Sequence, residues 1–336
     1  MDKKISALTE NEGVSLPETT NNSAAQKIKL SRAKQHSVEA FVKNILAGDI
    51  PFLSRAITLV ESTTVKHQQK ANVILERCLP FTNNSIRIGI TGVPGVGKST
   101  FIEAFGKHLT SQGKKVAVLA VDPSSSLNKG SILGDKTRME ELVTDKNAFI
   151  RPSPSGTSLG GVAQKTRESI ILCEAAGFDT IIIETVGVGQ SETVVHSMVD
   201  FFLLLKLSGA GDELQGMKRG IIEMADAIVI HKADGDNVQR AKMAKVAFTN
   251  AMHLYPLKEN KWQPKVVTAS ALEKHGIAEI DLLISEYIQL TKQNTSFENK
   301  RNAQNKFWLL STIEEQLKSN FYQNHEMIPW SIRSFP

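Results

Sequence analysis

The first ordered part of the chain repeats hydrophobic and polar positions with helical spacing. Residues 37–62, SVEAFVKNILAGDIPFLSRAITLVES, alternate apolar and polar side chains at the period of an amphipathic helix. Residues 47–49, Ala-Gly-Asp, interrupt that pattern, so we expect two helices, the second of which continues to about Cys78. Pro80 and the polar residues 82–85 then predict a loop.

From residue 86 onward the pattern changes to short apolar runs separated by helical stretches. The runs are continuous rather than alternating, which is typical of strands covered by helices on both faces. Strand, helix, strand repetition predicts an α/β fold with a mostly parallel, doubly wound sheet and right-handed crossovers. The expected strands are residues 86–91, 116–121, 180–184, 201–207, 227–232 and 265–270.

The two ends of the chain differ from this middle part. The first 36 residues contain no aromatic side chain and are rich in polar residues, so we expect a disordered tail and no signal or transit peptide. Beyond about residue 292 the chain turns polar, and residues 303–322 predict one amphipathic helix. The expected parts are the tail (1–36), an N-terminal helical extension (37–80), a nucleotide-binding domain (81–292) and a C-terminal helical arm (293–336).

Composition excludes several function classes. Lys and Arg exceed Asp and Glu by 40 − 35 = 5, and the basic residues are scattered, so we expect no nucleic-acid partner. No run reaches the roughly 18 apolar residues of a membrane span, so we expect no membrane association. Cys78 and Cys173 lie far apart in helical stretches, which favours buried thiols in the cytoplasm over a disulfide.

The segment GVPGVGKST at residues 92–100 follows the first apolar run and precedes a helical stretch. It fits the G-x4-G-K-S phosphate loop in the context that this motif requires. Its glycines let backbone N–H groups face a β-phosphate, and the helix N-terminus adds a positive dipole. Lys98 can reach the β- and γ-phosphates, and the Ser99 hydroxyl can ligate Mg²⁺. The expected nucleotide-binding residues here are Gly92, Val93, Pro94, Gly95, Val96, Gly97, Lys98, Ser99 and Thr100.

Three acidic residues are candidates for the metal side of this site. Asp122 and Glu184 follow or end apolar strands, at the edge of a doubly wound sheet where the phosphate loop also lies. Asp135 lies in a Gly-flanked loop that could order around a γ-phosphate. Mg²⁺ takes one or two carboxylates and keeps several waters. Each acid could instead cap the helix that follows it.

The run AIVIHKADGD at residues 227–236 indicates the base. GTPases commonly read guanine with Asn-Lys-x-Asp, in which the Asp accepts from the guanine N1–H and 2-amino group and the Lys packs along the base. Lys232 and Asp234 match this pattern, whereas His231 stands in place of Asn. Adenine has an acceptor at N1, so the Asp234 carboxylate disfavours ATP. An ordinary Lys/Asp turn is the alternative.

A second segment supports a guanine site. In TASAL, at residues 268–272, the last three residues stand at the end of a predicted strand. We expect these three, Ser270, Ala271 and Leu272, to form the loop that contacts the base.

The chain resembles the methylmalonyl-CoA mutase-associated G proteins, the MeaB, MMAA and ArgK family, which also carries the older label of LAO/AO transport system ATPases. The resemblance spans roughly residues 37–325, and Val93 stands near the place where related ATPases with a deviant phosphate loop carry a second lysine. The matching segments are residues 46–49, 55–62, 90–100, 119–126, 130–139, 151–163, 183–192, 207–221 and 268–272.

The resemblance implies a P-loop GTPase that converts GTP to GDP and phosphate with Mg²⁺. Residues 130–138 and 186–192 match its first two switches, and residues 211–220 match a third switch peculiar to the family. By chemistry, Lys218 could offset charge that develops on the transferred phosphoryl group. The residues that match the metal shell are Ser99, Asp122, Asp135 and Glu184, and the expected catalytic residues are Lys98, Glu184, Gln215 and Lys218.

The resemblance also implies partners. Members form homodimers, partly through C-terminal helices, and residues 305–317 match as a helix with an apolar stripe, although a covered core helix is the alternative. The client is an adenosylcobalamin-dependent acyl-CoA mutase, most simply methylmalonyl-CoA mutase. The family assists its cofactor loading and its protection or reactivation.

Two other functions remain open from the residues. One is an ATPase or kinase that energises lysine, arginine and ornithine transport, as the older label says. The other is a metal chaperone GTPase for nickel enzymes, which usually carries Cys or His clusters that we do not find in the sequence. The residue that positions the attacking water is also open, with Gln190, Glu192 and Gln215 as candidates.

Overall fold

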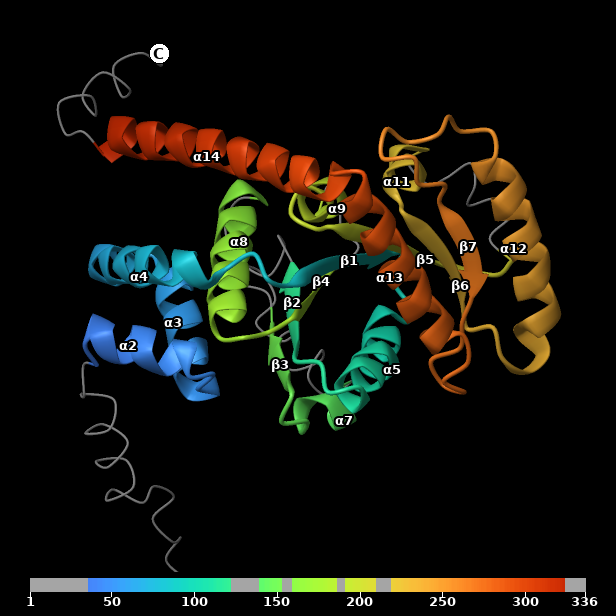
Figure 1. Ribbon diagram of the computed structural model, residues 1–336, viewed down its shortest axis with the longest axis horizontal. Helices are drawn as coiled ribbons and strands as arrows, with labels where there is room; N and C mark the ends of the chain where they lie inside the picture. The colour runs from blue at the N-terminus through green and yellow to red at the C-terminus, as the bar shows by residue number, and fades with distance from the viewer. Residues whose placement is uncertain (1–35, 122–138, 153–158, 186–190, 210–218, 324–336) are drawn as a thin grey trace, which may run out of the picture.

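A computed structural model describes residues 36–121, 139–152, 159–185, 191–209 and 219–323 of the protein. A sheet of seven parallel strands in the order β3-β2-β4-β1-β5-β6-β7 forms its centre (Figure 1). The predicted α/β fold with a parallel, doubly wound sheet is confirmed. The strands are β1 (Ile86–Gly92), β2 (Val116–Val121), β3 (Ala148–Arg151), β4 (Thr180–Thr185), β5 (Phe201–Leu207), β6 (Ala227–His231) and β7 (Lys265–Thr268).

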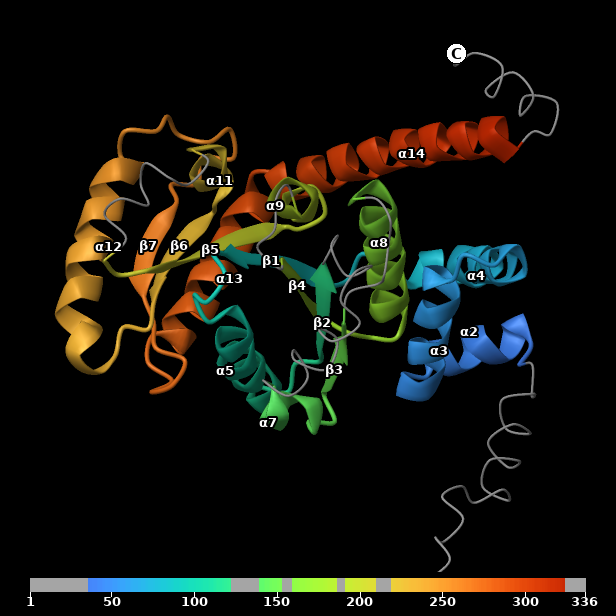
Figure 2. The same ribbon diagram turned by 180° about the vertical axis from the view of Figure 1, so that it is seen from behind.

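Helices cover both faces of the sheet (Figures 1 and 2). One face packs against α5, α7 and α13, and the other packs against α8, α9, α11 and α12, with α2 to α4 beyond α8. The long helices are α2 (Val38–Leu46), α3 (Ile50–Glu61), α4 (Val65–Cys78), α5 (Lys98–Ser111), α8 (Leu159–Ala175), α12 (Val238–Met252), α13 (Ile277–Gln293) and α14 (Ser296–Gln323). The short ones are η1 (Leu79–Phe81), α7 (Glu140–Val143), α9 (Ser191–His196), α11 (Arg219–Met224) and η2 (Gly235–Asn237).

The strand order creates the crevice that positions the site. β1 lies between β4 and β5, with Ile90 beside Glu184 on one side and Gly92 beside Leu205 on the other. The connection from β1 leads to β2 on one side, whereas the connection from β4 leads to β5 on the other side. Ligands of open α/β sheets bind outside the carboxyl ends of the strands at such a point. The phosphate loop begins at this place, directly after β1.

The N-terminal helices differ from the prediction in one respect. The expected second helix is two helices, α3 and α4, separated by residues 62–64. The three residues there, Ser-Thr-Thr, favour caps and extended backbone over helix interiors. The predicted break before α3 is present, because the Asp49 side chain accepts from the Phe52 N–H at 2.9 Å and caps the new helix.

One further element, β3, was missed in the sequence, and the predicted C-terminal helix begins earlier than expected. β3 has only four residues and pairs with β2 at the edge of the sheet, too short a run to separate from a loop. α14 begins at Ser296, earlier than the predicted start at 303, and its polar first turns are held by the body of the protein. The buried Arg301 guanidinium binds Asp200 at 2.7 and 2.8 Å and also donates to the carbonyl of Ser85 at 2.6 Å.

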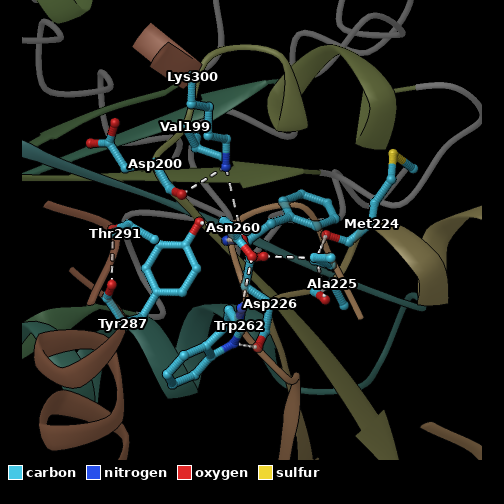
Figure 3. A network of polar contacts seen from close by, with 12 residues as sticks. Val199, Asp200, Met224, Ala225, Asp226, Asn260, Trp262, Tyr287, Thr291 and Lys300 are labelled. Atoms are coloured by element: carbon cyan, nitrogen blue, oxygen red, sulfur yellow. Dashed lines mark hydrogen bonds and ion pairs between the residues drawn. The ribbon is translucent and has the colours of Figure 1, made fainter. Parts of the chain in front are cut away.

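A buried polar network joins the amino ends of β5 and β6 (Figure 3). Asp226 accepts from Lys258 Nζ at 2.7 Å and from the Phe202 N–H at 2.9 Å, and its carbonyl accepts from Trp262 Nε1 at 2.8 Å. Lys258 also donates to the carbonyl of Met224, so it satisfies the end of α11. These bonds fix the amino ends of β5 and β6, which lie opposite the carboxyl ends where the phosphate loop begins.

The two cysteines are free and buried, as expected. Burial raises the pKa of Cys78 to about 11, and it raises the pKa of Cys173 further, so both stay protonated thiols at neutral pH. Among the helices in the described ranges, none combines the length and the apolar character needed to cross a bilayer.

Candidate nucleotide-binding site

The phosphate loop connects the carboxyl end of β1 to the first residue of α5. Gly97 caps α5 in the left-handed conformation, with φ at 94°. Glycine adopts this conformation without the clash that a Cβ causes. Gly92 is needed for a different reason, because a Cβ there would lie 2.6 Å from the carbonyl oxygen of Leu205 on the neighbouring strand. The loop therefore depends on glycine at both of its ends.

Lys98, the first residue of α5, reaches back over this loop. Its Nζ donates to the carbonyls of Gly92 at 2.8 Å and Val93 at 3.3 Å, and the side chain is buried. The ammonium group thus lies inside the curve of the loop, beside the N-terminus of a 14-residue helix. A bound phosphate chain would exchange these carbonyl contacts for stronger, charge-assisted bonds.

Ser99 and Glu184 are the two predicted metal ligands that the structure places. Ser99 Oγ lies 3.4 Å from Glu184 Oε1, and both side chains are buried. This separation is long for an O–H···O hydrogen bond, which is about 2.5–3.0 Å. A hydroxyl and a carboxylate oxygen suit a hard cation such as Mg²⁺, so this pair fits the metal that the phosphate loop implies.

Four predicted residues lie outside the described residues: Asp122, Asp135, Gln215 and Lys218. The same holds for Gln190 and for the three predicted switches, apart from the beginning of α9 with Glu192 and the residues that open α11. Within the described part of the chain, no three His, Cys, Asp or Glu side chains gather as a metal-binding group. The full metal shell and the catalytic roles of Gln215 and Lys218 therefore stay predictions.

A buried hydroxyl pair, missed in the sequence, supports this part of the site. Thr185 Oγ1 donates to Thr91 Oγ1 at 2.9 Å, and both residues are almost fully buried. The bond joins the carboxyl ends of β4 and β1, one residue beyond Glu184 and one residue before Gly92. The available signal was a Thr at the end of each of two apolar runs, which becomes meaningful only once the strands are known to be neighbours.

The two segments predicted to read the base follow β6 and β7 and are hydrogen-bonded to each other. Ser270 Oγ donates to Asp234 Oδ2 at 2.5 Å, and it also accepts from the Glu273 N–H at 3.1 Å. The Ala233 N–H donates to the carbonyl of Ala269 at 3.0 Å, so main-chain and side-chain bonds connect the two loops. Asp234 is thereby fixed with carboxylate lone pairs left to accept from a base.

The two other loop residues predicted to contact the base lie differently. Ala271 is buried, whereas Leu272 is 81% exposed. Ser270 and His275 exchange main-chain hydrogen bonds of 3.0 Å, which closes the loop into a tight turn. Leu272 is therefore an apolar side chain at the tip of a fixed loop, a suitable cover for a flat base.

The residues before Asp234 contact the phosphate loop. His231 Nδ1 lies 2.8 Å from the carbonyl oxygen of Val96, and Lys232 Nζ donates to the carbonyl of Gly95 at 2.9 Å. The sequence had marked His231 only as a departure from the Asn of the guanine motif. The structure instead brings it against the loop that would hold the phosphates.

The glycine loop between β1 and α5, with Lys98 folded back over it, has the geometry of a phosphate loop. The family model described as "Methylmalonyl Co-A mutase-associated GTPase MeaB" matches residues 53–326. The chain belongs to this family. The predicted resemblance is therefore confirmed.

Curated members of the MeaB family are similar over most of their length. The chain is 51% identical over 284 residues to a "Putative GTPase" of Caulobacter vibrioides, with 84% of this chain and 87% of that protein covered. It is 47% identical to "GTPase ArgK" of Escherichia coli, covering 85% and 86% of the two chains. It is 45% identical to the mouse "Methylmalonic aciduria type A homolog, mitochondrial", covering 87% and 73%.

A solved structure, "Crystal structure of LAO/AO transport system kinase", has the same fold with a TM-score of 0.73. It is 39% identical in sequence, and the match covers 88% of this chain and 89% of that one. The names of the MeaB relatives support a nucleotide hydrolase that binds guanine nucleotides.

Proposed function

We propose that this protein is a GTP-hydrolysing chaperone for an adenosylcobalamin-dependent acyl-CoA mutase, with methylmalonyl-CoA mutase as the client. It would convert GTP to GDP and phosphate while assisting the loading of the cofactor and the protection or reactivation of the mutase. The proposal joins the chain's membership of the MeaB family to the chemistry of its own site.

One observation carries the choice of GTP. The Asp234 carboxylate is held by Ser270 at 2.5 Å, two residues after Lys232, which donates to the Gly95 carbonyl of the phosphate loop. Guanine presents two N–H donors on the edge that such a carboxylate would meet, whereas adenine presents an acceptor there. A fixed carboxylate therefore strengthens the binding of guanine and weakens the binding of adenine.

The residues on the phosphate side would act by position and charge. Lys98 would neutralise the β- and γ-phosphates, and the oxygens of Ser99 and Glu184 would hold Mg²⁺, together with Asp122 and Asp135. When bound, Mg²⁺ supplies electrostatic stabilisation of the charge that develops during phosphoryl transfer. We assign Gln215 and Lys218 of the third switch to the activation of hydrolysis by the partner.

We also propose a homodimer formed partly by α14. This helix extends beyond the sheet in both ribbon views (Figures 1 and 2), and its outer part exposes a row of large apolar side chains. A contiguous exposed apolar surface of this kind is typical of a protein–protein interface. Its members are Phe307, Leu309, Leu310, Ile313, Leu317 and Phe321.

A role in lysine, arginine and ornithine transport is the second candidate, because the solved relative is titled a LAO/AO transport system kinase. That role requires adenine to be bound in preference to guanine. The Asp234 carboxylate opposes this preference, so we rank the transport role below the GTPase. Direct comparison of the GTP and ATP affinities separates the two.

The test of the chaperone role uses purified protein with methylmalonyl-CoA mutase. We expect the mutase to accelerate GTP turnover, and we expect GTP to accelerate the recovery of mutase that carries a damaged cofactor. The Lys98→Ala variant should lose both effects, since it lacks the cation for the phosphates. If GTP turnover and mutase recovery both stay unchanged in the mixture, the chaperone role is wrong.

A further inference from the structure

His231, the last residue of β6, connects the base-reading segment to the phosphate loop. The residue is 2% exposed, and its Nδ1 lies 2.8 Å from the carbonyl oxygen of Val96. A carbonyl oxygen can only accept, so Nδ1 must carry the hydrogen in this contact. The imidazole is therefore a hydrogen-bond donor that faces the backbone of the phosphate loop.

This bond determines the direction of a neighbouring N–H group. In a planar trans peptide, the C=O of one residue and the N–H of the next point in opposite directions, and no described peptide is cis. When His231 holds the Val96 carbonyl toward β6, the N–H of Gly97 is directed away from β6. Backbone N–H groups of this loop are the groups that bind the phosphates, so His231 controls the orientation of one of them.

The imidazole has little freedom to leave this position. A Cβ on Gly97 would lie 3.0 Å from Cε1 and 3.1 Å from Nδ1 of the ring, so the ring packs directly on the glycine. On α5, the Phe101 ring contacts the imidazole edge-on with a centroid distance of 5.7 Å. Packing against Gly97 and Phe101 therefore fixes the position of the donor.

The rest of the ring cannot read a base. Nε2 is closed off from solvent and has no hydrogen-bond partner among the described residues. Burial lowers the pKa of His231, so the ring is neutral and its Nε2 carries a lone pair. A ligand in the nucleotide site cannot reach an atom that water does not reach.

We infer that His231 is a positioning residue that fixes the phosphate loop through Val96 and does not contact the base. The inference rests on the proposed function as a nucleotide-binding protein. It explains how His replaces the Asn of the guanine motif, because His Nδ1 and Asn Nδ2 are both bonded directly to Cγ. Both residues can therefore place an N–H at the same distance from the backbone.

Three variants separate this role from simple core packing. His231→Ala removes the donor, and we expect GDP affinity to fall about three- to tenfold, the usual worth of one hydrogen bond. His231→Asn restores a donor at the same position, and we expect most of the affinity to return. His231→Gln carries the same amide one methylene further out, so it should not restore affinity.

Base selectivity tests whether His231 contacts the base, because loss of a base contact would change the selectivity and loss of a phosphate-loop contact would not. Inosine diphosphate lacks the 2-amino group that Asp234 is expected to accept. We expect all three variants to keep the wild-type ratio of GDP to IDP affinity, because the loss falls on the phosphates. A His253→Asn variant, which changes an exposed histidine, controls for loss of histidine alone.

The experiment measures dissociation constants for fluorescent GDP, IDP and ADP, together with melting temperatures. In wild-type protein labelled with ¹⁵N-histidine, we also expect the His231 ring to be in the Nδ1–H tautomer. The NMR signal of that ring should be absent from His231→Asn. A changed GDP to IDP ratio, equal affinity of the Asn and Gln variants, or unchanged affinity in the Ala variant would overturn the inference. If His231→Ala unfolds, the comparison of Asn with Gln still decides.

The proposed function fails separately. If the wild type prefers ADP, the guanine assignment is wrong. The three His231 variants then test the phosphate-loop role with ADP, and the same order of affinities is required.

Discussion

Ser270 donates to Asp234 across 2.5 Å, and this bond joins the loops that follow β6 and β7. The same stretch of chain binds the phosphate loop two and three residues earlier, through Lys232 and His231. The segments predicted to read the base and to bind the phosphates are therefore joined by hydrogen bonds within the protein.

Reversing the hydrogen-bonding character of Asp234 should change the preferred base. In Asp234→Asn the amide presents a donor where the guanine N–H groups need an acceptor, so we expect GDP affinity to fall by a factor on the order of 100 or more. Xanthine carries a carbonyl at C2, which can accept from the amide, so affinity for xanthosine diphosphate should rise. Competition against a fluorescent nucleotide measures both, and parallel loss for the two bases would contradict the role.

Glu184→Gln keeps the size of the side chain and removes its charge. Glu184 Oε1 lies 3.4 Å from Ser99 Oγ, where we expect Mg²⁺ to bind. The variant should therefore need roughly tenfold more Mg²⁺ for half-maximal GTP hydrolysis, because loss of a group that supports a metal typically lowers metal affinity by about that factor. GDP affinity without Mg²⁺ should change little. Glu286→Gln, at an exposed position, is the control. An unchanged Mg²⁺ requirement would remove Glu184 from the metal site.

Charges placed on the exposed apolar row of α14 should dissociate the dimer. Leu310 and Leu317 are seven residues apart on one side of the helix and are 52% and 64% exposed. We expect Leu310→Asp with Leu317→Asp to yield a monomer in analytical ultracentrifugation, because the introduced charges cannot be buried unpaired. Leu254→Asp with Leu257→Asp, two exposed leucines outside α14, should remain dimeric. A wild type that is already monomeric would exclude this interface.

Asp145 should contribute to stability at neutral pH and lose that contribution in acid. The Lys107 ammonium, with the Asn147 N–H and the Thr110 hydroxyl, lowers the pKa of Asp145 from 3.8 to about 2. A depressed folded-state pKa stabilises the fold above the unfolded value and loses this effect as pH falls through the folded value. The difference in unfolding free energy between wild type and Asp145→Asn should be constant above pH 5. It should shrink between about pH 4 and pH 2.

Urea titrations at several pH values check this expectation. Other carboxyl groups also titrate in acid, and the comparison of the two proteins cancels their shared contribution. A difference that stays constant down to pH 2, or that grows, would contradict the role given to Lys107.

The strands and the phosphate side of the site were predictable because their signals are local. Continuous apolar runs identified six strands, and Lys98 and Ser99 follow from a motif whose spacing is fixed by backbone geometry. The helix break at residues 62–64 also has a local cause, but three residues with modest helix propensity are a weak signal inside a long helical pattern. β3, with four residues, carries too little pattern to be recognised.

The remaining features depend on contacts between distant segments. α14 starts early because Arg301 is bound by Asp200, which is 101 residues away in the chain. The Thr91–Thr185 pair needs β1 and β4 to be neighbours, a fact of topology. From the sequence, His231 was only a departure from the Asn of the guanine motif. That an imidazole can donate a hydrogen bond where the Asn amide would donate one becomes apparent only from its contact with the Val96 carbonyl.

The central claim is that this site selects guanine, and a calorimetric comparison of GDP and ADP binding tests it most directly. Two hydrogen bonds to the Asp234 carboxylate favour GDP, and the adenine N1 acceptor opposes the same group. We therefore predict that GDP binds on the order of 100-fold more tightly than ADP, or better. Equal affinities, or tighter binding of ADP, would contradict the account.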